Sequence, residues 1–290
     1  LYDTITFPAE RAEVTSPFSP LPEPGMGGAS NAWAVATNRA ASDAPLLATD
    51  PHLWLSAPSV WYLARLSSPG YDVIGGTIPG IPAVLIGRNA RFGWGLTTAH
   101  VDDQDLYIER LDPDDPSRYR TPEGWAPFEV QRETIRVAGG ESETLTLRRS
   151  RHGPVMPPGA DLDFSSVTPA GHVVALAWTA LTAEDRSLDA ALGLMRADTL
   201  EQGAEAAKDH VAPAQNVVMA DASGIGMVVA GAVPLRHPDS PSQGRVPALG
   251  WIASNDWQGM MPPETLPRAL RPRSGAVANA NNRTTNAPFP

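Results

Sequence analysis

The sequence predicts an α+β protein in which packed β-sheets are flanked by a few helices. Short runs in which apolar and polar residues alternate, the pattern typical of strands, occur along most of the chain. The 30 prolines and 25 glycines are spread out rather than concentrated, which indicates strands separated by turns. One long region, 187–210, instead has helical character. Sheets with helices packed outside them accommodate this set of elements.

The first half of the chain is expected to consist mainly of short strands. Residues 16–28, SPFSPLPEPGMGG, are rich in proline and glycine and are expected to form a linker. A short helix is expected at 58–67, with Trp61, Leu63 and Leu66 packed inward. Strands are expected at 31–37, 45–50, 71–75, 83–86, 93–98 and 105–111.

The second half is expected to contribute two hairpins, one further strand and the helical region. In that region Leu188, Ala191, Leu192 and Met195 form an apolar stripe, and the following residues are rich in alanine and glutamate. The expected hairpins join 128–137 to 144–149 and 216–220 to 224–230, and the single strand is 173–179.

Composition and motif content argue against several classes of function. A formal net charge of −10 is unsuited to a nucleic-acid partner, and no run approaches the roughly 18 apolar residues of a membrane span. Zero cysteines exclude thiol catalysis, disulfides and cysteine–metal sites. Walker, G-x-G-x-x-G, H-E-x-x-H and G-x-S-x-G motifs are absent. The six histidines lack metal-ligand spacing, and His152, within His-Gly-Pro, is expected at a structural turn.

Residues 25–36, GMGGASNAWAVA, place small residues directly before a serine and a strand-like run. They fit an ordinary turn, or a loop that is cut to leave Ser30 at a new chain end. An α-amine has a pKa of roughly 7.7–8.0, against about 10.4 for lysine, so a terminal serine brings its own general base. The Ser30 hydroxyl can attack the Ala29 carbonyl, and the ester then hydrolyses. From this stretch alone the turn is favoured over cleavage.

An ordered series of short motifs reverses that preference. It comprises SNAW at 30–33, DPHL at 50–53, PGIP at 79–82, GRN at 87–89, WGLTT at 94–98, DDQDLY at 102–107, HGPV at 152–155, AQN at 214–216 and ANANN at 278–282. Each motif alone is weak, but the ordered set, from about Gly27 to the C-terminus, resembles the penicillin acylase family of N-terminal-nucleophile hydrolases. The resemblance implies an αββα four-layer sandwich, of which this chain would hold part.

The resemblance implies a catalytic role for Ser30 as the nucleophile, released by self-cleavage between Ala29 and Ser30. Residues 1–29 would then be the end of an α-chain plus a spacer, and 30–290 the N-terminal part of a catalytic β-chain. The family usually has glycine before the serine, so Ala29 is expected to slow processing without forbidding it. His52 stands where cephalosporin and acyl-homoserine-lactone acylases carry histidine and penicillin G acylases carry glutamine. It is expected to hydrogen-bond Ser30 and to orient or tune its amine.

By the same resemblance, two hydrogen-bond donors stabilise the oxyanion formed during acyl transfer. One is the backbone N–H of Thr98 or of neighbouring Ala99, and the residue count from the serine favours Thr98. The other is the side-chain amide of Asn281, with Asn279 as its competitor. Donors of this kind are worth about 3 kcal/mol each where measured in a protease. The alternative for 279–282 is a turn-forming asparagine cluster.

Asp102, Gln104 and Asp105 match a segment that helps bind calcium in penicillin acylases. Two carboxylates and the backbone oxygen of Gln104 are suitable hard ligands. Calcium takes six to eight oxygens, so further ligands would have to come from elsewhere. A solvated acidic loop is the alternative. No organic cofactor is expected.

The function expected from the resemblance is hydrolysis of the linear amide bond of an N-acyl small molecule through an acyl-Ser30 ester. Acyl-homoserine lactones, β-lactams and general N-acyl amides stay open as substrates, and His52 argues against the penicillin G type. Residue 1 is leucine and no apolar signal segment follows, so an internal piece of a longer precursor is expected, with the α-chain of that precursor as partner. The implied compartment is periplasmic or extracellular. The alternatives are a secreted non-catalytic binding module or an inactive family member.

Overall fold

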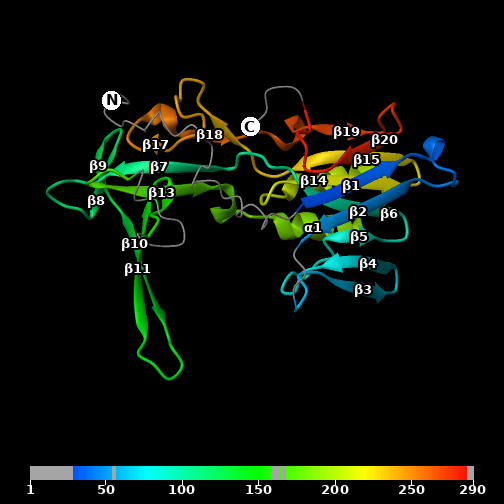
Figure 1. Ribbon diagram of the computed structural model, residues 1–290, viewed down its shortest axis with the longest axis horizontal. Helices are drawn as coiled ribbons and strands as arrows, with labels where there is room; N and C mark the ends of the chain where they lie inside the picture. The colour runs from blue at the N-terminus through cyan, green and yellow to red at the C-terminus, as the bar shows by residue number, and fades with distance from the viewer. Residues whose placement is uncertain (1–28, 54–56, 158–163, 165–167, 286–290) are drawn as a thin grey trace. The chain divides into compact units, whose positions relative to one another are not determined.

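The described part of the chain forms two compact units. The computed structural model describes residues 29–53, 57–157, 164 and 168–285. Of these residues the first unit, called the sandwich unit, contains 29–53, 57–103, 182–234 and 260–285. The second, called the hairpin unit, contains 104–157, 164, 168–181 and 235–259. Figure 1 labels the main elements of both units.

A sheet of seven antiparallel strands, called the large sheet, forms the centre of the sandwich unit. Its strand order is β19-β15-β14-β6-β5-β4-β3. The bounds are β3 (Tyr62–Ser68), β4 (Tyr71–Thr77), β5 (Ile86–Arg88), β6 (Phe92–Thr98), β14 (Gln215–Asp221), β15 (Gly224–Ala230) and β19 (Arg268–Leu270). Strand β14 pairs with β6 over its whole length, although more than a hundred residues separate them in sequence.

A second, small sheet packs on one face of the large sheet. It has the order β2-β1-β20, with β1 (Ala29–Val35), β2 (Leu46–His52) and β20 (Ala276–Asn279). Ala32 and Ala34 point inward and form a core with Val218 of β14. The two sheets approach so closely that a Cβ on Gly95 of β6 would lie 2.5 Å from the Cβ of Thr49. Glycine and alanine at the interface therefore set the spacing of the sheets.

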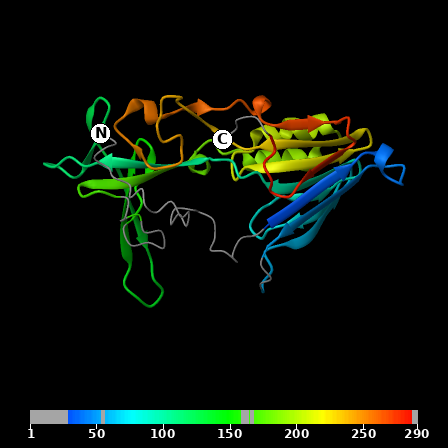
Figure 2. The same cartoon turned by 45° about the horizontal axis from the view of Figure 1, so that its top comes forward.

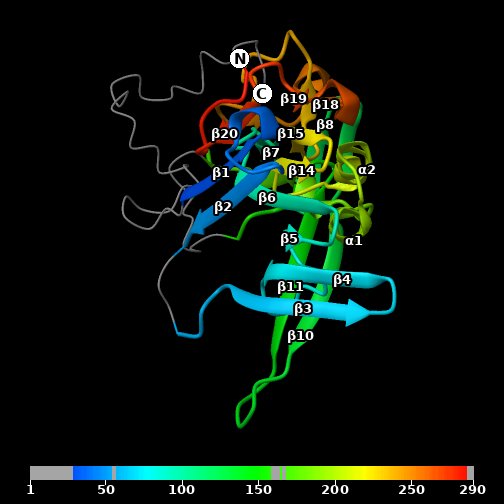
Figure 3. The same ribbon diagram turned by 90° about the vertical axis from the view of Figure 1, so that its right-hand side faces the viewer.

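Helices cover the other face of the large sheet. Figure 3 shows β1 and β2, then β6 and β14, then α1 and α2 as successive layers. The expected helical region is divided into α1 (Ser187–Arg196), α2 (Leu200–Ala206) and the 3₁₀ turn η5 (Ala207–Asp209). Ala197 is extended, and the Thr199 side chain caps α2 by accepting from the Gln202 N–H. Apolar side chains of both helices pack on Phe92 and Trp94. This stacking of helices and two sheets confirms the predicted α+β class.

The hairpin unit is formed almost entirely by short antiparallel strands. β7 (Gln104–Arg110) lies between β13 (His172–Trp178) and β17 (Ala248–Leu249). The long hairpin of β10 and β11 is seen in Figures 1 and 2. The remaining strands are β8 (Arg118–Thr121), β9 (Gly124–Pro127), β10 (Glu129–Ile135), β11 (Glu143–Ser150), β12 (Gly153–Pro154), β16 (Pro234–Arg236) and β18 (Trp257–Met260). The other 3₁₀ turns within the described residues are η2 (Thr37–Arg39), η4 (Thr179–Leu181), η6 (Ala253–Asn255) and η7 (Pro263–Thr265).

The prediction of a helix at 58–67 is wrong. From Tyr62 to Ser68 the chain forms β3, which pairs with β4 and lies at the edge of the large sheet. Leu63 and Leu66, expected inside, are 85% and 44% exposed. A Pro-Gly turn at 69–70 leads the chain directly into β4. The prediction failed because a short apolar run in a sequence fits a strand as well as a helix.

The other expected elements are present with shifted ends. The strand expected at 83–86 begins only at Ile86, and both expected hairpins are confirmed. The expected linker at 16–28 lies outside the described residues. No helix in the described part of the chain is long and apolar enough to cross a membrane.

Candidate active site

Ser30 lies at the start of β1, on the face that is turned toward the large sheet. It shares this face with Ala32 and Ala34, because alternate residues of a strand point to the same side. Its backbone N–H donates to Oδ1 of Asn281 over 2.6 Å. The serine is therefore held at the end of its strand by a residue from the far end of the chain.

Asn281 lies two residues after the end of β20 and joins the two sheets through its side chain. Its φ of 61° is in the left-handed region, which asparagine tolerates better than most residues. While Oδ1 accepts from Ser30, Nδ2 donates to the backbone oxygen of Thr98 over 3.0 Å. The amide of Asn281 thus connects the first residues of β1 to the last residue of β6.

Backbone geometry distinguishes Thr98 from Ala99 as an oxyanion donor. The Ala99 N–H already donates to the Ala214 carbonyl oxygen over 3.0 Å. Successive N–H groups of a strand point to opposite edges, so the Thr98 N–H points away from β14. On that side β5 pairs with β6 only at Gly93 and Trp94. The Thr98 N–H therefore points away from β14 while the Ala99 N–H is bonded to it, and the oxyanion role of Thr98 stays a prediction.

The structure also distinguishes the two candidate asparagines. Asn279 is 3% exposed, and its Oδ1 accepts from the Thr97 hydroxyl and from the Asn281 N–H, each over 2.8 Å. Its Nδ2 donates to the carbonyl oxygen of Asn282. Asn281, and not Asn279, is the residue whose side chain contacts Ser30.

His52 is close to Ala29 and Ser30 in strand register but lies on the other face of the small sheet from the Ser30 side chain. It pairs directly with Ala29, while Ser30 pairs with Pro51. Paired residues share a face, so the His52 ring and the Ser30 side chain start from opposite faces. The His52 Nε2 is 2.8 Å from Oδ2 of Asp50. Its expected hydrogen bond to Ser30 stays a prediction.

The side chain of Asp105 is held within the hairpin unit. Its Oδ2 accepts from Nε of Arg236 over 2.9 Å and from the Trp257 indole N–H. A carboxylate oxygen that faces a guanidinium does not fit a calcium ligand, which leaves Oδ1 for that role. No cluster of three or more histidine, aspartate or glutamate side chains suited to a metal is found among the residues that the structure describes. Calcium at Asp102, Gln104 and Asp105 stays a prediction.

Two polar networks were not singled out from the sequence. One surrounds His152, which is placed between Glu109 and Asp256 at 2.7 and 3.0 Å and stacks on the Tyr107 ring. The other links Thr97 to Asn279 and to Asn216, whose AQN segment belonged to the motif series. Apart from Glu109 and Asp256, their residues stood in recognised motifs, but nothing in the sequence pairs them.

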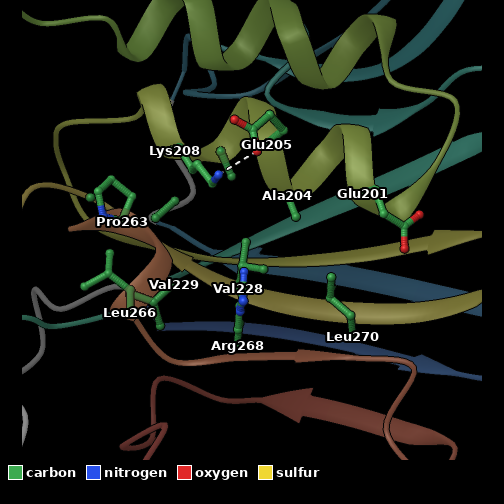
Figure 4. A pocket seen from close by; sticks show the side chains of 13 residues that line it. Glu201, Ala204, Glu205, Lys208, Val228, Val229, Pro263, Leu266, Arg268 and Leu270 are labelled. Atoms are coloured by element: carbon green, nitrogen blue, oxygen red, sulfur yellow. Dashed lines mark ion pairs between the residues drawn. The ribbon is translucent and has the colours of Figure 1, made fainter.

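Two hollows lie away from these residues. A cavity of about 190 Å³ is enclosed by α2, β15, β19 and the η7 turn, and Figure 4 shows its apolar floor and the Lys208–Glu205 ion pair at its rim. An open groove of about 1090 Å³ runs beside β2 and over β4 and β5. Ser30, Thr98 and Asn281 line neither of them.

Comparisons with known proteins show which proteins this chain is similar to. The family model described as penicillin amidase matches residues 4–290. The acyl-homoserine lactone acylase QuiP of Pseudomonas aeruginosa is 35% identical over 260 residues, which cover 88% of this chain and 30% of that protein. Penicillin G acylase of Escherichia coli is 30% identical over 283 residues, which cover 96% of this chain and 32% of that protein. This chain thus spans about a third of the length of these curated relatives.

A solved structure is also similar to this chain. The thermostable penicillin G acylase from Alcaligenes faecalis superimposes with a TM-score of 0.78 at 29% identity, over 89% of this chain and 45% of that one. The similarity therefore extends to the fold. On the match of sequence and fold together, the chain belongs to the penicillin amidase family.

Proposed function

We propose that this chain carries the catalytic centre of an amidase that cleaves N-acyl substrates with a self-released N-terminal serine. The observation that carries the proposal is the 2.6 Å contact between the Ser30 nitrogen and Oδ1 of Asn281. Asn281 is itself tied to Thr98, so the nitrogen that would become the α-amine lies beside both proposed oxyanion donors. Such pre-arranged donors are the feature that acyl transfer requires.

Self-cleavage would use the same groups before the enzyme is mature. The Ser30 hydroxyl attacks the Ala29 carbonyl carbon, the C–N bond breaks, and the Ser30 nitrogen leaves as an amine with the hydroxyl proton. Water then hydrolyses the resulting ester, which frees the hydroxyl and the Ala29 carboxylate. The contact to Asn281 supports this step because an amine, like the peptide N–H, can donate to Oδ1.

In the mature enzyme the free amine would act as the general base. The Ser30 hydroxyl attacks the substrate amide carbonyl while its proton passes to the α-amine. The Thr98 N–H and Nδ2 of Asn281 hold the oxyanion, and Nδ2 has a second hydrogen besides the one given to Thr98. The amine product leaves with the proton, and water then releases the acid from acyl-Ser30.

The substrates proposed first are the N-acyl classes named for the relatives. QuiP is named as an acyl-homoserine lactone acylase, and another relative, from Pseudomonas sp., as a penicillin acylase 2 proenzyme. The proposal also includes an α-chain from the same precursor as partner, calcium as a structural ion and a periplasmic or extracellular location. None of these takes part in the reaction steps above.

The test is to express the full-length gene product and determine the chain ends by mass spectrometry. The expected result is a fragment that begins at Ser30, together with hydrolysis of chromogenic N-acyl substrates and of acyl-homoserine lactones of graded chain length. Ser30→Ala should stay uncut and inactive. Ser42→Ala, at an exposed serine of the same unit, is the matched control and should behave as wild type.

Two results would contradict the proposal. One is a wild-type chain that stays intact and binds acyl ligands without hydrolysing them, which would indicate a binding module. The other is a Ser30→Ala protein that still matures and hydrolyses amides.

A further inference from the structure

Three buried polar side chains from three different strands form a continuous hydrogen-bonded chain beneath Ser30. Asn216 on β14 is 0% exposed, Thr97 on β6 is 1% exposed and Asn279 on β20 is 3% exposed. Nδ2 of Asn216 lies 3.1 Å from Oγ1 of Thr97, and that hydroxyl lies 2.8 Å from Oδ1 of Asn279. The chain crosses from the large sheet to the small sheet.

The direction of each hydrogen bond in this chain is determined by its partners. Oδ1 of Asn279 receives the backbone N–H of Asn281, so the oxygen and not the amide nitrogen faces Thr97. The Thr97 hydroxyl must therefore donate to Asn279. It accepts in turn from Nδ2 of Asn216, which is also 3.4 Å from the carbonyl oxygen of Thr98. Both asparagine amides have a single orientation that satisfies these contacts.

The chain ends on the backbone of the two residues proposed to supply the oxyanion donors, at the N–H of Asn281 and the carbonyl oxygen of Thr98. Asn279 holds the N–H of Asn281, whose φ of 61° is a conformation that costs about 1–2 kcal/mol for most residues with a side chain. This backbone conformation directs the Asn281 amide to Ser30. At the other end Asn216 contacts the Thr98 peptide, next to Thr97 in β6. One hydroxyl therefore connects the supports of both donors.

A purely stabilising role accounts less well for the network. Oδ1 of Asn216 is buried and has no hydrogen-bond partner within the described residues. A buried polar network with an unsatisfied member contributes less to stability than apolar packing of the same volume. Orientation of the neighbouring groups is an effect that such a network supplies regardless of its net stability.

We propose that Thr97, Asn216 and Asn279 are positioning residues that aim the Asn281 amide and the Thr98 peptide at the reacting carbon. They do not touch the substrate themselves. The inference rests on the proposed function, and it adds that the geometry of the oxyanion site depends on one buried threonine hydroxyl. A loss of alignment should act on the transition state more than on substrate binding.

The test compares Thr97→Val, which keeps the shape and removes the hydroxyl, with Thr97→Ser, which keeps the hydroxyl. Per cleaved enzyme, we expect Thr97→Val to lower kcat by about 10- to 100-fold with KM changed less than about twofold, and to slow self-cleavage. The kcat of Thr97→Ser, also per cleaved enzyme, should stay within about threefold of the wild-type kcat. Thr97→Cys, with its weak S–H donor, should be intermediate and is the substitute if the valine variant does not fold.

The matched control is Thr77→Val in β4 of the same large sheet. Thr77 is 3% exposed, and its hydroxyl donates to the Ala83 carbonyl oxygen over 2.6 Å, so the variant also loses a buried hydroxyl hydrogen bond. Its kcat should equal that of wild type even if its melting temperature falls.

Two results would overturn the inference, and a third would contradict the proposed function instead. Wild-type kcat and cleavage rate in Thr97→Val, at a temperature where it is folded, would overturn the inference. A loss of kcat in Thr77→Val as large as that in Thr97→Val would also overturn it, because the effect would then follow from stability. A wild-type protein that neither cleaves nor hydrolyses would contradict the proposed function itself.

Discussion

The backbone nitrogen of Ser30 and the side-chain oxygen of Asn281 lie 2.6 Å apart, although 251 residues separate them in the sequence. The contact exists because β1 pairs with β20 in a register that brings Ala32 opposite Asn279. Asn281 lies two residues after Asn279, and Ser30 lies two residues before Ala32. Both residues therefore lie just beyond the same end of the pairing between β1 and β20. The antiparallel pairing of two distant strands thus assembles the candidate site.

The amide of Asn281 can be tested separately from its backbone conformation. Asn281→Gly fits a φ of 61° without strain, whereas Asn281→Ala must adopt a left-handed conformation. Both variants should lose about 100- to 1000-fold in kcat, because both lack the side-chain donor. The alanine variant should be less stable than the glycine variant by about 1 kcal/mol in the free energy of unfolding. Steady-state kinetics and denaturant titration measure the two effects; an active glycine variant would exclude Asn281 as a donor.

Because the two sheets approach closely at Gly95, one methyl group added there is expected to lower the stability of the fold. A Cβ there would lie 2.5 Å from Cβ of Thr49, so Gly95→Ala should destabilise the fold by about 1–3 kcal/mol. Gly93→Ala, two residues earlier on the same strand face, meets only ordinary contacts beyond 3.5 Å and should change stability by less than about 0.5 kcal/mol. Equal midpoints of unfolding in denaturant for the two variants would contradict the described packing.

Acid should weaken the hairpin unit through Asp256. Burial alone would raise the pKa of this carboxyl, but hydrogen bonds from His152 and Arg151 outweigh burial and hold the pKa below its ordinary value. A carboxyl whose pKa is lower in the folded state adds stability above its unfolded pKa of about 3.9, and this contribution is lost as pH falls through the folded pKa. Thermal unfolding recorded from neutral to acidic pH should show the loss.

In the Asp256→Asn variant this part of the acid dependence should be absent. Glu123→Gln, at an exposed turn of the same unit, should keep the wild-type profile. If Asp256→Asn and wild type lose stability in parallel on acidification, the contacts of Asp256 contribute nothing to the pH dependence.

The predicted calcium site is tested by melting temperature. A ligand that binds only the folded chain at about 100 times its Kd stabilises it by about 2.7 kcal/mol. Calcium added after chelation should therefore raise the melting temperature of the full-length protein, and Asp102→Asn should reduce that shift. An unchanged melting temperature in the presence of calcium would leave the segment as an acidic loop.

Particular elements show where sequence reasoning succeeded and where it failed. The hairpin of β14 and β15 was predictable because alternation and a short turn are local signals. Strand β3 was missed because its apolar residues are exposed at a sheet edge, where burial no longer shapes the pattern. The break between α1 and α2 was not predicted, although the Thr199 cap on the Gln202 N–H is a local signal that follows the extended Ala197.

The sequence alone determined which residue types are available for chemistry: no cysteine, a serine after small residues, and motifs in the order typical of one family. Only the tertiary structure shows that Asn281, and not Asn279, contacts Ser30, that the Ala99 N–H bonds to Ala214, and on which sheet face His52 starts. The physical reason is that hydrogen bonds are directional and short, so their partners depend on strand register. Register is set by packing between segments that are far apart in the chain.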